Sequence, residues 1–206
     1  MNLAILISGR GSNMEAILTA IEEGKIKNVK PSVVISDEPS AAGLKVAAEK
    51  FSVPTVALPA SGLKGWTYDQ KLVSALEGHG VTQNTGLICL AGFMRILSTE
   101  FVRRYRMRIM NIHPALLPSF PGLHAQKKAV EYGVKVSGCT VHFVDEDIDT
   151  GPILLQMSVP VLDSDTEYEL AERILAAEHE LYLEAVRLFS KGTVTVRGRR
   201  VSVENS

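Results

Sequence analysis

Residues 3–13 read LAILISGRGSN, an apolar run that ends in a glycine-rich turn. A wholly apolar stretch from Leu3 to Ser8 is typical of a strand covered on both faces, as in parallel sheets. The next residues, 13–23, carry apolar side chains at the spacing of one helical face: Met14, Ile17, Leu18 and Ile21. The opening of the chain therefore predicts a strand–turn–helix unit.

The same alternation continues through the first half. We expect further strands at residues 32–36, 53–58, 86–91 and 108–112, and helices at 41–50 and 66–78. The helix at 41–50 should direct Ala42, Val46 and Ala47 inward, and the helix at 66–78 should direct Leu72, Val73 and Leu76 inward. Strands that alternate with helices in this way predict an α/β fold with a doubly wound, mostly parallel sheet.

The second half changes character. Strands are expected at 137–144 and 153–159, on either side of an acidic loop, followed by a long helix over 167–190 that ends at Gly192. The tail, 193–203, has the pattern of a β-hairpin that turns near Gly198. Because no repeat, linker or low-complexity stretch interrupts the chain, we expect residues 1–206 to form a single domain.

Composition narrows the class of protein. The chain has 206 residues, of which 46% are hydrophobic and 22% charged, and its net charge is −1. Without a surplus of basic residues a nucleic-acid partner is not expected, and the arginine-rich segment 103–108 is interpreted as a solvated face that leads into a strand. No apolar run suits a membrane span or signal peptide, so we expect a cytoplasmic protein. Cys89 and Cys139 should be buried thiols, and the five histidines lack metal-ligand spacing, so no metal is expected.

The glycine turn has two interpretations. Gly9 and Gly11 allow a tight turn, Ser12 or Asn13 can cap the following helix, and the free N–H groups of that helix favour an anion such as phosphate. The third glycine of a dinucleotide fingerprint would fall at Met14. Asp37 could still imitate the ribose-binding acid of that fingerprint, so a nicotinamide enzyme is a possible alternative, as is a turn without any ligand.

Asn111 and His113 carry the strongest chemical signal. Side chains two residues apart in a strand point to the same side, and an amide beside an imidazole suits the stabilisation of a carbonyl oxygen that becomes anionic. Asp149, in the acidic loop, would raise the pKa of His113 if it lay nearby, and could receive a proton. The alternative is a structural histidine and an aspartate that serves its own turn. His124 and His142 are interpreted as structural.

Four segments in order resemble the glycinamide ribonucleotide formyltransferase family: LISGRGSN at 6–13, LAGFMRIL at 90–97, NIHPALLP at 111–118 with PGLH at 121–124, and DTGP at 149–152. The resemblance covers nearly all of residues 2–190. It implies a Rossmann-like formyltransferase fold and the direct transfer, through a tetrahedral intermediate, of a formyl group from 10-formyltetrahydrofolate to the amine of glycinamide ribonucleotide. That reaction belongs to purine biosynthesis.

The resemblance also implies roles for single residues. Asn111 and protonated His113 would hold the oxyanion, while Asp149 would orient His113 and manage proton transfer. The substrate phosphate would bind at Gly11, Ser12 and Asn13, and the rest of the ribonucleotide at Pro114 and Glu178. The folate would bind at Met94, Arg95, Ile96, Leu97, Asp145, Asp147 and Asp149. Residues 1–112 would form the phosphate-binding half and 113–190 the folate and catalytic half, in a monomer or homodimer.

Two positions depart from the pattern of some members. Arg10 stands where some carry Asn, and Leu175 where some carry a polar substrate contact. Two sister enzymes share the Asn, His and Asp set. Formyltetrahydrofolate hydrolase usually adds an amino-terminal regulatory domain, and methionyl-tRNA formyltransferase adds a carboxyl-terminal RNA-binding domain, whereas only about 16 residues follow the long helix here. An alternative from another functional class is a protein that binds folate without catalysing a reaction.

Overall fold

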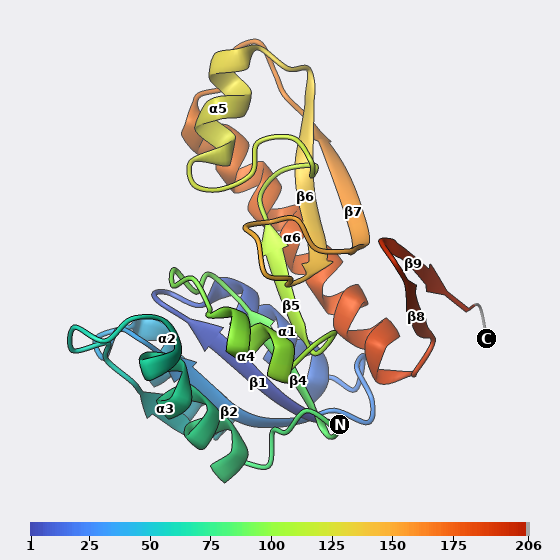
Figure 1. Ribbon diagram of the computed structural model, residues 1–206. Helices are drawn as coiled ribbons and strands as arrows, with labels where there is room; N and C mark the ends of the chain where they lie inside the picture. The colour runs from blue at the N-terminus through green and yellow to red at the C-terminus, as the bar shows by residue number, and fades with distance from the viewer. Residues whose placement is uncertain (205–206) are drawn as a thin grey trace.

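The computed structural model describes residues 1–204, most of which surround a seven-stranded sheet of order β3-β2-β1-β4-β5-β6-β7 (Figure 1). Its strands have these bounds: β1 (Asn2–Ile7), β2 (Lys30–Ser36), β3 (Thr55–Ala57), β4 (Gly86–Leu90), β5 (Ile109–His113), β6 (Val136–Phe143) and β7 (Ile153–Pro160). A separate two-stranded hairpin of β8 (Val194–Arg197) and β9 (Arg200–Val203) lies beside β7.

The sheet is mostly parallel. The strand β1 pairs in parallel with β2 and β4, β2 with β3, and β4 with β5, whereas β6 is antiparallel to β5 and β7 is antiparallel to β6. The strand order reverses at β1, and in open α/β sheets ligands bind at the carboxyl ends of the strands beside such a switch point. The predicted α/β fold is confirmed, and a site is expected where β1, β4 and β5 end.

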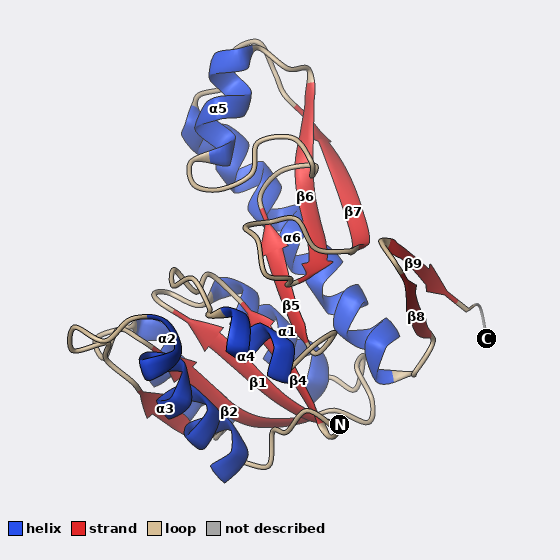
Figure 2. Ribbon diagram, viewed as in Figure 1, coloured by secondary structure: helices blue, strands red, loops and turns tan. Residues whose placement is uncertain are grey.

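Helices cover both faces of the sheet (Figure 2). Their bounds are α1 (Ser12–Glu22), α2 (Ala42–Phe51), α3 (Gly65–Gly78), α4 (Thr99–Arg104), α5 (Ala125–Tyr132) and α6 (Glu167–Ser190). Residues of β1 alternate between two cores, since Leu3 and Ile5 pack with α1 and α6, whereas Ala4 and Leu6 pack with α3 and α4. This double coverage explains why the first strand is apolar along its whole length.

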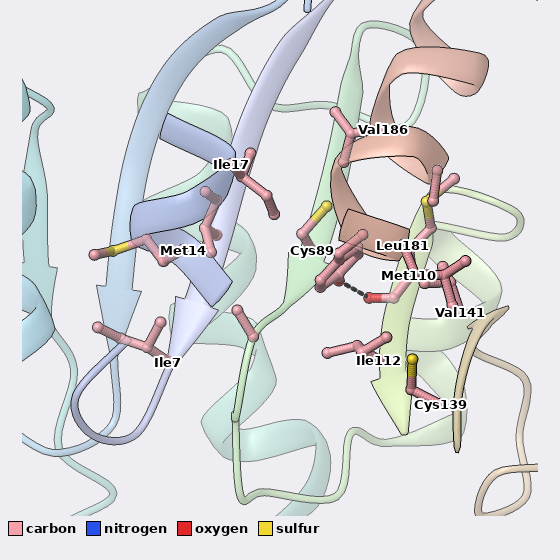
Figure 3. Packing of buried hydrophobic residues seen from close by; sticks show 14 of the residues in the cluster. Ile7, Met14, Ile17, Cys89, Met110, Ile112, Cys139, Val141, Leu181 and Val186 are labelled. Atoms are coloured by element: carbon pink, nitrogen blue, oxygen red, sulfur yellow. Dashed lines mark hydrogen bonds between the residues drawn. The ribbon is translucent and has the colours of Figure 1, made fainter. Parts of the chain in front are cut away.

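In the larger core, α1 and α6 pack apolar side chains against β4 and β5 (Figure 3). The hydroxyl of Tyr182, from α6, donates to the carbonyl oxygens of Leu90 at 3.2 Å and Met110 at 2.9 Å. A single buried side chain therefore joins the last residue of β4 to β5. Cys89 and Cys139 are fully buried free thiols, as predicted.

Most predicted elements are present, with small shifts at their ends. The long helix has the predicted bounds, and the hairpin turns at Gly198. Ala42 was predicted to point inward and is exposed; the buried residue beside it is Gly43. The helices α4 and α5 were not predicted. Within the described part of the chain, no helix combines the length and the apolar character needed to cross a membrane.

Candidate active site

The strand β5 brings Asn111 and His113 to the same side, as the two-residue spacing predicted. In the antiparallel register Asn111 pairs with His142 of β6, and His113 pairs with Thr140. His113 is only 4% exposed, while Asn111 is half-buried. Four polar residues of two adjacent strands therefore gather where β5 ends.

Asp149 meets His113, which the sequence alone could not establish. Its Oδ2 lies 3.3 Å from Nδ1 of His113 and accepts a 2.8 Å hydrogen bond from the N–H of Gly122. The backbone of Asp149 is left-handed, with a φ of 55°. Burial alone would raise the pKa of Asp149, but the adjacent His142 ring, the Gly122 N–H and His113 together lower it to about 2. The carboxylate is therefore ionised at neutral pH.

The turn that carries Asp149 is fixed by Gly151. A Cβ at this position would lie 1.7 Å from the carbonyl oxygen of Phe143, so only glycine allows the loop to pack against the end of β6. The next residue, Pro152, accepts a hydrogen bond at its carbonyl from the N–H of Phe143. The acidic loop is thus anchored directly behind its catalytic candidate.

Two opposing effects act on the pKa of His113. Burial lowers the pKa of His113, and the Asp149 carboxylate, which acts in the opposite direction, offsets this only in part. Asp149 therefore acts in the predicted direction, but the net pKa is lowered because the sequence-based argument left out desolvation. The Nε2 atom lies 2.9 Å from the carbonyl oxygen of Phe120, and because a carbonyl only accepts, Nε2 carries the hydrogen.

His142 was interpreted as structural, yet it contacts the candidate site. Its Nε2 lies 3.2 Å from Nδ2 of Asn111 and 3.6 Å from Oδ1 of Asp149. Its Nδ1 lies 3.0 Å from the carbonyl oxygen of Phe143, so Nδ1 carries the hydrogen and Nε2 can accept from the Asn111 amide. His142 therefore fixes the direction of that amide. His124, in contrast, is exposed at the start of α5.

Pro114 begins the loop after β5, and hydrogen bonds to Thr140 hold this loop in place. The buried hydroxyl of Thr140 donates to the carbonyl of Ala115 at 2.7 Å and accepts from the N–H of Leu117 at 3.0 Å. The side chain of Gln156 donates to both Leu117 O and Thr140 Oγ1, at 2.9 and 3.0 Å. The loop that follows His113 is consequently tied to β6 and β7.

The glycine turn presents free amides at the start of α1. The N-cap residue is Gly11, with a φ of 76°, and not Ser12 or Asn13 as predicted. The first intrahelical bond runs from the N–H of Glu15 to the carbonyl of Gly11, so the N–H groups before it have no partner within the helix. Gly43 of α2 donates to the carbonyl of Gly9 at 3.1 Å and holds the turn in place.

Asn13 and Glu178 meet although they lie 165 positions apart. The Nδ2 atom of Asn13 donates to Oε2 of Glu178 at 2.8 Å, and each residue is 7% exposed. Burial raises the pKa of Glu178 to about 7, although the bond from Asn13 acts against this shift. The Oδ1 atom of Asn13 is buried and has no partner within residues 1–204. The α6 carboxyl therefore lies directly beside the glycine turn.

The segment after β4 lies along the same edge of the sheet. Met94 and Ile96 are 69% and 74% exposed, and Leu97 is half-buried. The side chain of Arg95 is not free in solvent like those of Met94 and Ile96. Its guanidinium stacks on Tyr68, 4.0 Å from the ring centroid, and donates to the carbonyl of Leu63 at 2.9 Å.

The remaining predicted folate residues lie in the acidic loop, where Asp145 accepts a 2.7 Å bond from Thr150 and Asp147 is exposed. Within residues 1–204, no group of three or more His, Cys, Asp or Glu side chains is placed so that it could hold a metal ion. The dinucleotide alternative gains no support, because Met14 is fully buried at the place of the third glycine and Asp37 is engaged by Ser8.

Comparison with known proteins finds similar sequences and structures along nearly the whole chain. The family model described as formyl transferase matches residues 1–186. The phosphoribosylglycinamide formyltransferase of Escherichia coli is 39% identical over 193 residues, which cover 93% of this chain and 88% of that protein. The crystal structure of glycinamide ribonucleotide transformylase 1 from Symbiobacterium toebii superposes with a TM-score of 0.93 at 45% identity, and covers 100% of this chain and 94% of that one.

A third relative is much longer. The trifunctional purine biosynthetic protein adenosine-3 of Drosophila melanogaster is 44% identical over 197 residues, which are 94% of this chain but 14% of that protein. The chain thus spans about one seventh of such trifunctional relatives.

Proposed function

The chain belongs to the formyl transferase family, and we propose that it transfers the formyl group of 10-formyltetrahydrofolate to the amine of glycinamide ribonucleotide. The products are formylglycinamide ribonucleotide and tetrahydrofolate, as purine biosynthesis requires. The observation that carries this proposal is the 3.3 Å approach of Asp149 to His113, beside the amide of Asn111. An ionised carboxylate, an imidazole and an amide donor at one strand end suit acyl transfer to an amine.

In this proposal Asn111 stabilises the developing oxyanion. Its Nδ2 has two hydrogens, and His142 accepts one of them, so the second is available for the formyl oxygen. Because His142 already fixes the orientation of the amide, little reorganisation accompanies the reaction.

Asp149 and His113 act together on protons. Because the pKa of Asp149 is about 2 and that of His113 is lowered, the pair can accept one proton, held between Oδ2 of Asp149 and Nδ1 of His113. The amine nitrogen attacks the formyl carbon to give a tetrahedral oxyanion and sheds a proton, which this pair receives directly or through water. While the oxyanion exists, the protonated ring would donate towards it if the formyl oxygen replaces the Phe120 carbonyl at Nε2. The oxyanion then collapses, the bond from the formyl carbon to the folate nitrogen breaks, and the pair returns the proton to that nitrogen, directly or through water.

The ribonucleotide is proposed to bind at the start of α1. The backbone N–H groups of Ser12 and Asn13, with Gly11 in its left-handed conformation, suit a phosphate, and the positive end of the helix dipole adds to this. Glu178 lies next to the turn through Asn13 and is proposed to contact the glycinamide part, together with Pro114.

The folate is proposed to lie against the segment Met94, Arg95, Ile96 and Leu97 and the loop that carries Asp145, Asp147 and Asp149. The exposed apolar side chains of Met94 and Ile96 support this, because a flat ring placed over them would bury apolar surface. We further propose a single cytoplasmic domain that acts as a monomer or homodimer without metal, membrane or nucleic acid, with its phosphate half in 1–112 and its folate half in 113–190.

The test is turnover by the purified protein, supplied with 10-formyltetrahydrofolate in the presence and absence of glycinamide ribonucleotide. We expect tetrahydrofolate to form only with the acceptor, in equal amount to formylated ribonucleotide. Release of formate without the acceptor as the dominant activity would instead establish a hydrolase. Tight folate binding without any turnover would establish a binding protein.

A further inference from the structure

Ser8, the residue after β1, is joined to the segment after β4 by two hydrogen bonds. Its N–H donates to the carbonyl of Gly92 at 3.0 Å, and its Oγ accepts from the N–H of Met94 at 2.9 Å. The same Oγ donates to Oδ1 of Asp37, after β2, at 2.6 Å. Three neighbouring strands of the sheet therefore end in one hydrogen-bonded group of side chain and backbone.

The direction of these hydrogen bonds means that Asp37 orients the hydroxyl of Ser8. A hydroxyl has one hydrogen, and since an ionised carboxylate only accepts, that hydrogen is committed to Asp37. The lone pairs of Oγ are then left for the N–H of Met94. A distance of 2.6 Å lies in the range of charge-assisted O–H···O⁻ bonds, which also strengthen the next bond in the chain.

The segment that receives this bond has little regular structure of its own. No helix begins until Thr99, and the side chains of Met94 and Ile96 extend into solvent. Polar contacts fix its course instead: the N–H of Met94 to Ser8, the guanidinium of Arg95 to Leu63, and the N–H of Ser98 to Asp69 at 2.6 Å. The bond to Ser8 fixes the end of the segment nearest to β4.

We infer that Ser8 and Asp37 are positioning residues for folate recognition: Asp37 orients the Ser8 hydroxyl, which sets the backbone of residues 94–97. This rests on the proposed function, in which that segment binds the folate. Neither side chain needs to touch the folate, because the effect passes through the backbone N–H of Met94. The loss of either side chain should weaken folate binding and leave the ribonucleotide site, held by α2 and α6, largely intact.

The chain offers a matched control one residue away. Glu38 is also a carboxylate at the end of β2, but it is exposed and bonds only within its own turn, to the N–H and hydroxyl of Ser40 at 3.1 and 2.7 Å. Glu38→Ala therefore removes the same charge at nearly the same place without touching Ser8. Asp37→Asn keeps an oxygen that can accept from the hydroxyl and serves as the conservative variant.

The experiment compares the KM for 10-formyltetrahydrofolate with that for glycinamide ribonucleotide in wild type, Asp37→Ala, Asp37→Asn, Ser8→Ala and Glu38→Ala. We expect Asp37→Ala and Ser8→Ala to raise the folate KM on the order of tenfold, as the loss of a charge-assisted bond implies. The ribonucleotide KM of Asp37→Ala should change less than about twofold. Asp37→Asn, which keeps the acceptor oxygen but not its charge, should recover part of the folate affinity, and Glu38→Ala should match wild type.

Two outcomes would overturn the inference. One is a folate KM that stays at the wild-type value in both Ser8→Ala and Asp37→Ala. The other is an equal rise of both KM values in Asp37→Ala together with a lowered Tm, which would mean that the group only stabilises the fold. Failure of the proposed function is a separate result, because it would appear as absent transfer in the wild-type protein.

Discussion

The Nε2 atom of His113 lies 2.9 Å from the carbonyl oxygen of Phe120, while its Nδ1 faces Asp149 at 3.3 Å. Both ring nitrogens therefore have neighbours before any substrate is bound. The first contact fixes which nitrogen carries the hydrogen of the neutral ring, and the second leaves a proton-accepting lone pair beside a carboxylate. Together they make the charge of His113 dependent on Asp149.

Replacing Asp149 by Asn should lower the pKa of His113 further. The carboxylate is the main influence that raises this pKa, so its removal leaves only the hydrogen bond to the Phe120 carbonyl to oppose burial. Turnover should fall by about 10²–10⁴-fold, the range typical of a lost general acid or base. NMR titration of the His113 ring and steady-state kinetics would measure the two effects.

Asp163→Asn is the control for this experiment, because Asp163 is an exposed carboxylate whose partner is Lys135. It should leave both the pKa of His113 and turnover unchanged. If Asp149→Asn left the His113 titration at its wild-type position, the electrostatic coupling of the pair would be disproved.

Asn111→Ala should remove the proposed oxyanion donor and lower kcat by about 10²–10³-fold, with little change in either KM. The amide is held by His142 at 3.2 Å, so its loss also frees the His142 ring. Asn84→Ala, at an exposed turn before β4, is the matched control and should keep full activity. A kcat for Asn111→Ala within about threefold of wild type would remove this side chain from the proposed mechanism.

Hydrophobic periodicity predicted the parts of the fold that are long or fully buried. The strand predicted at residues 3–8 was recognised from the unbroken apolar run at 3–7, and the helix predicted at 167–190 repeats its apolar spacing along its length. The helix α4 has only six residues and lies partly in an arginine-rich segment, and α5 buries little more than Ala125 and Ala129. Such short or polar helices form because the surrounding chain fixes their ends, and a periodic pattern does not reveal them.

The candidate site was predictable only where its residues share one strand. Asn111 and His113 follow from two-residue alternation. The approach of Asp149 followed from family resemblance, since the loop that carries it returns to β5 through tertiary structure. His142 was missed because its position opposite Asn111 depends on the register of β5 with β6. Asp149 raises the pKa of His113 as predicted, but burial, which a local sequence does not contain, exceeds this effect and lowers the net pKa.

Glu178→Gln should stabilise the protein at alkaline pH. The folded state holds the Glu178 proton up to a pKa of about 7, whereas the ordinary value is 4.5. Between these values the folded state binds more protons than the unfolded one, so the free energy of unfolding falls as pH rises through this range. At about 1.4 kcal/mol per pKa unit the full penalty is about 3 kcal/mol, and a neutral glutamine avoids it.

Urea unfolding at pH 5 and pH 8 would measure this difference. Glu178→Gln should gain stability over wild type at pH 8 and much less at pH 5, although it should weaken ribonucleotide binding. Glu180→Gln, at an exposed position of the same helix, should show the same small difference from wild type at both pH values. A Glu178→Gln variant that is no more stable than wild type at pH 8 would contradict the prediction.

Gly11→Ala should weaken the binding of the ribonucleotide much more than the binding of the folate. A Cβ at Gly11 would lie 3.2 Å from Cε of Met14 and 3.4 Å from Cα of Gly43, so it would displace the turn proposed to hold the phosphate. Gly24→Ala is the matched control: its φ of 72° is close to the 76° of Gly11, but a Cβ there would have no neighbour within 4 Å. Both variants should lose about 1–2 kcal/mol of stability from left-handed backbone strain, measured by urea unfolding. Only Gly11→Ala should raise the ribonucleotide KM, by about tenfold or more, and an equal rise of the folate KM would show instead that the turn supports the whole site.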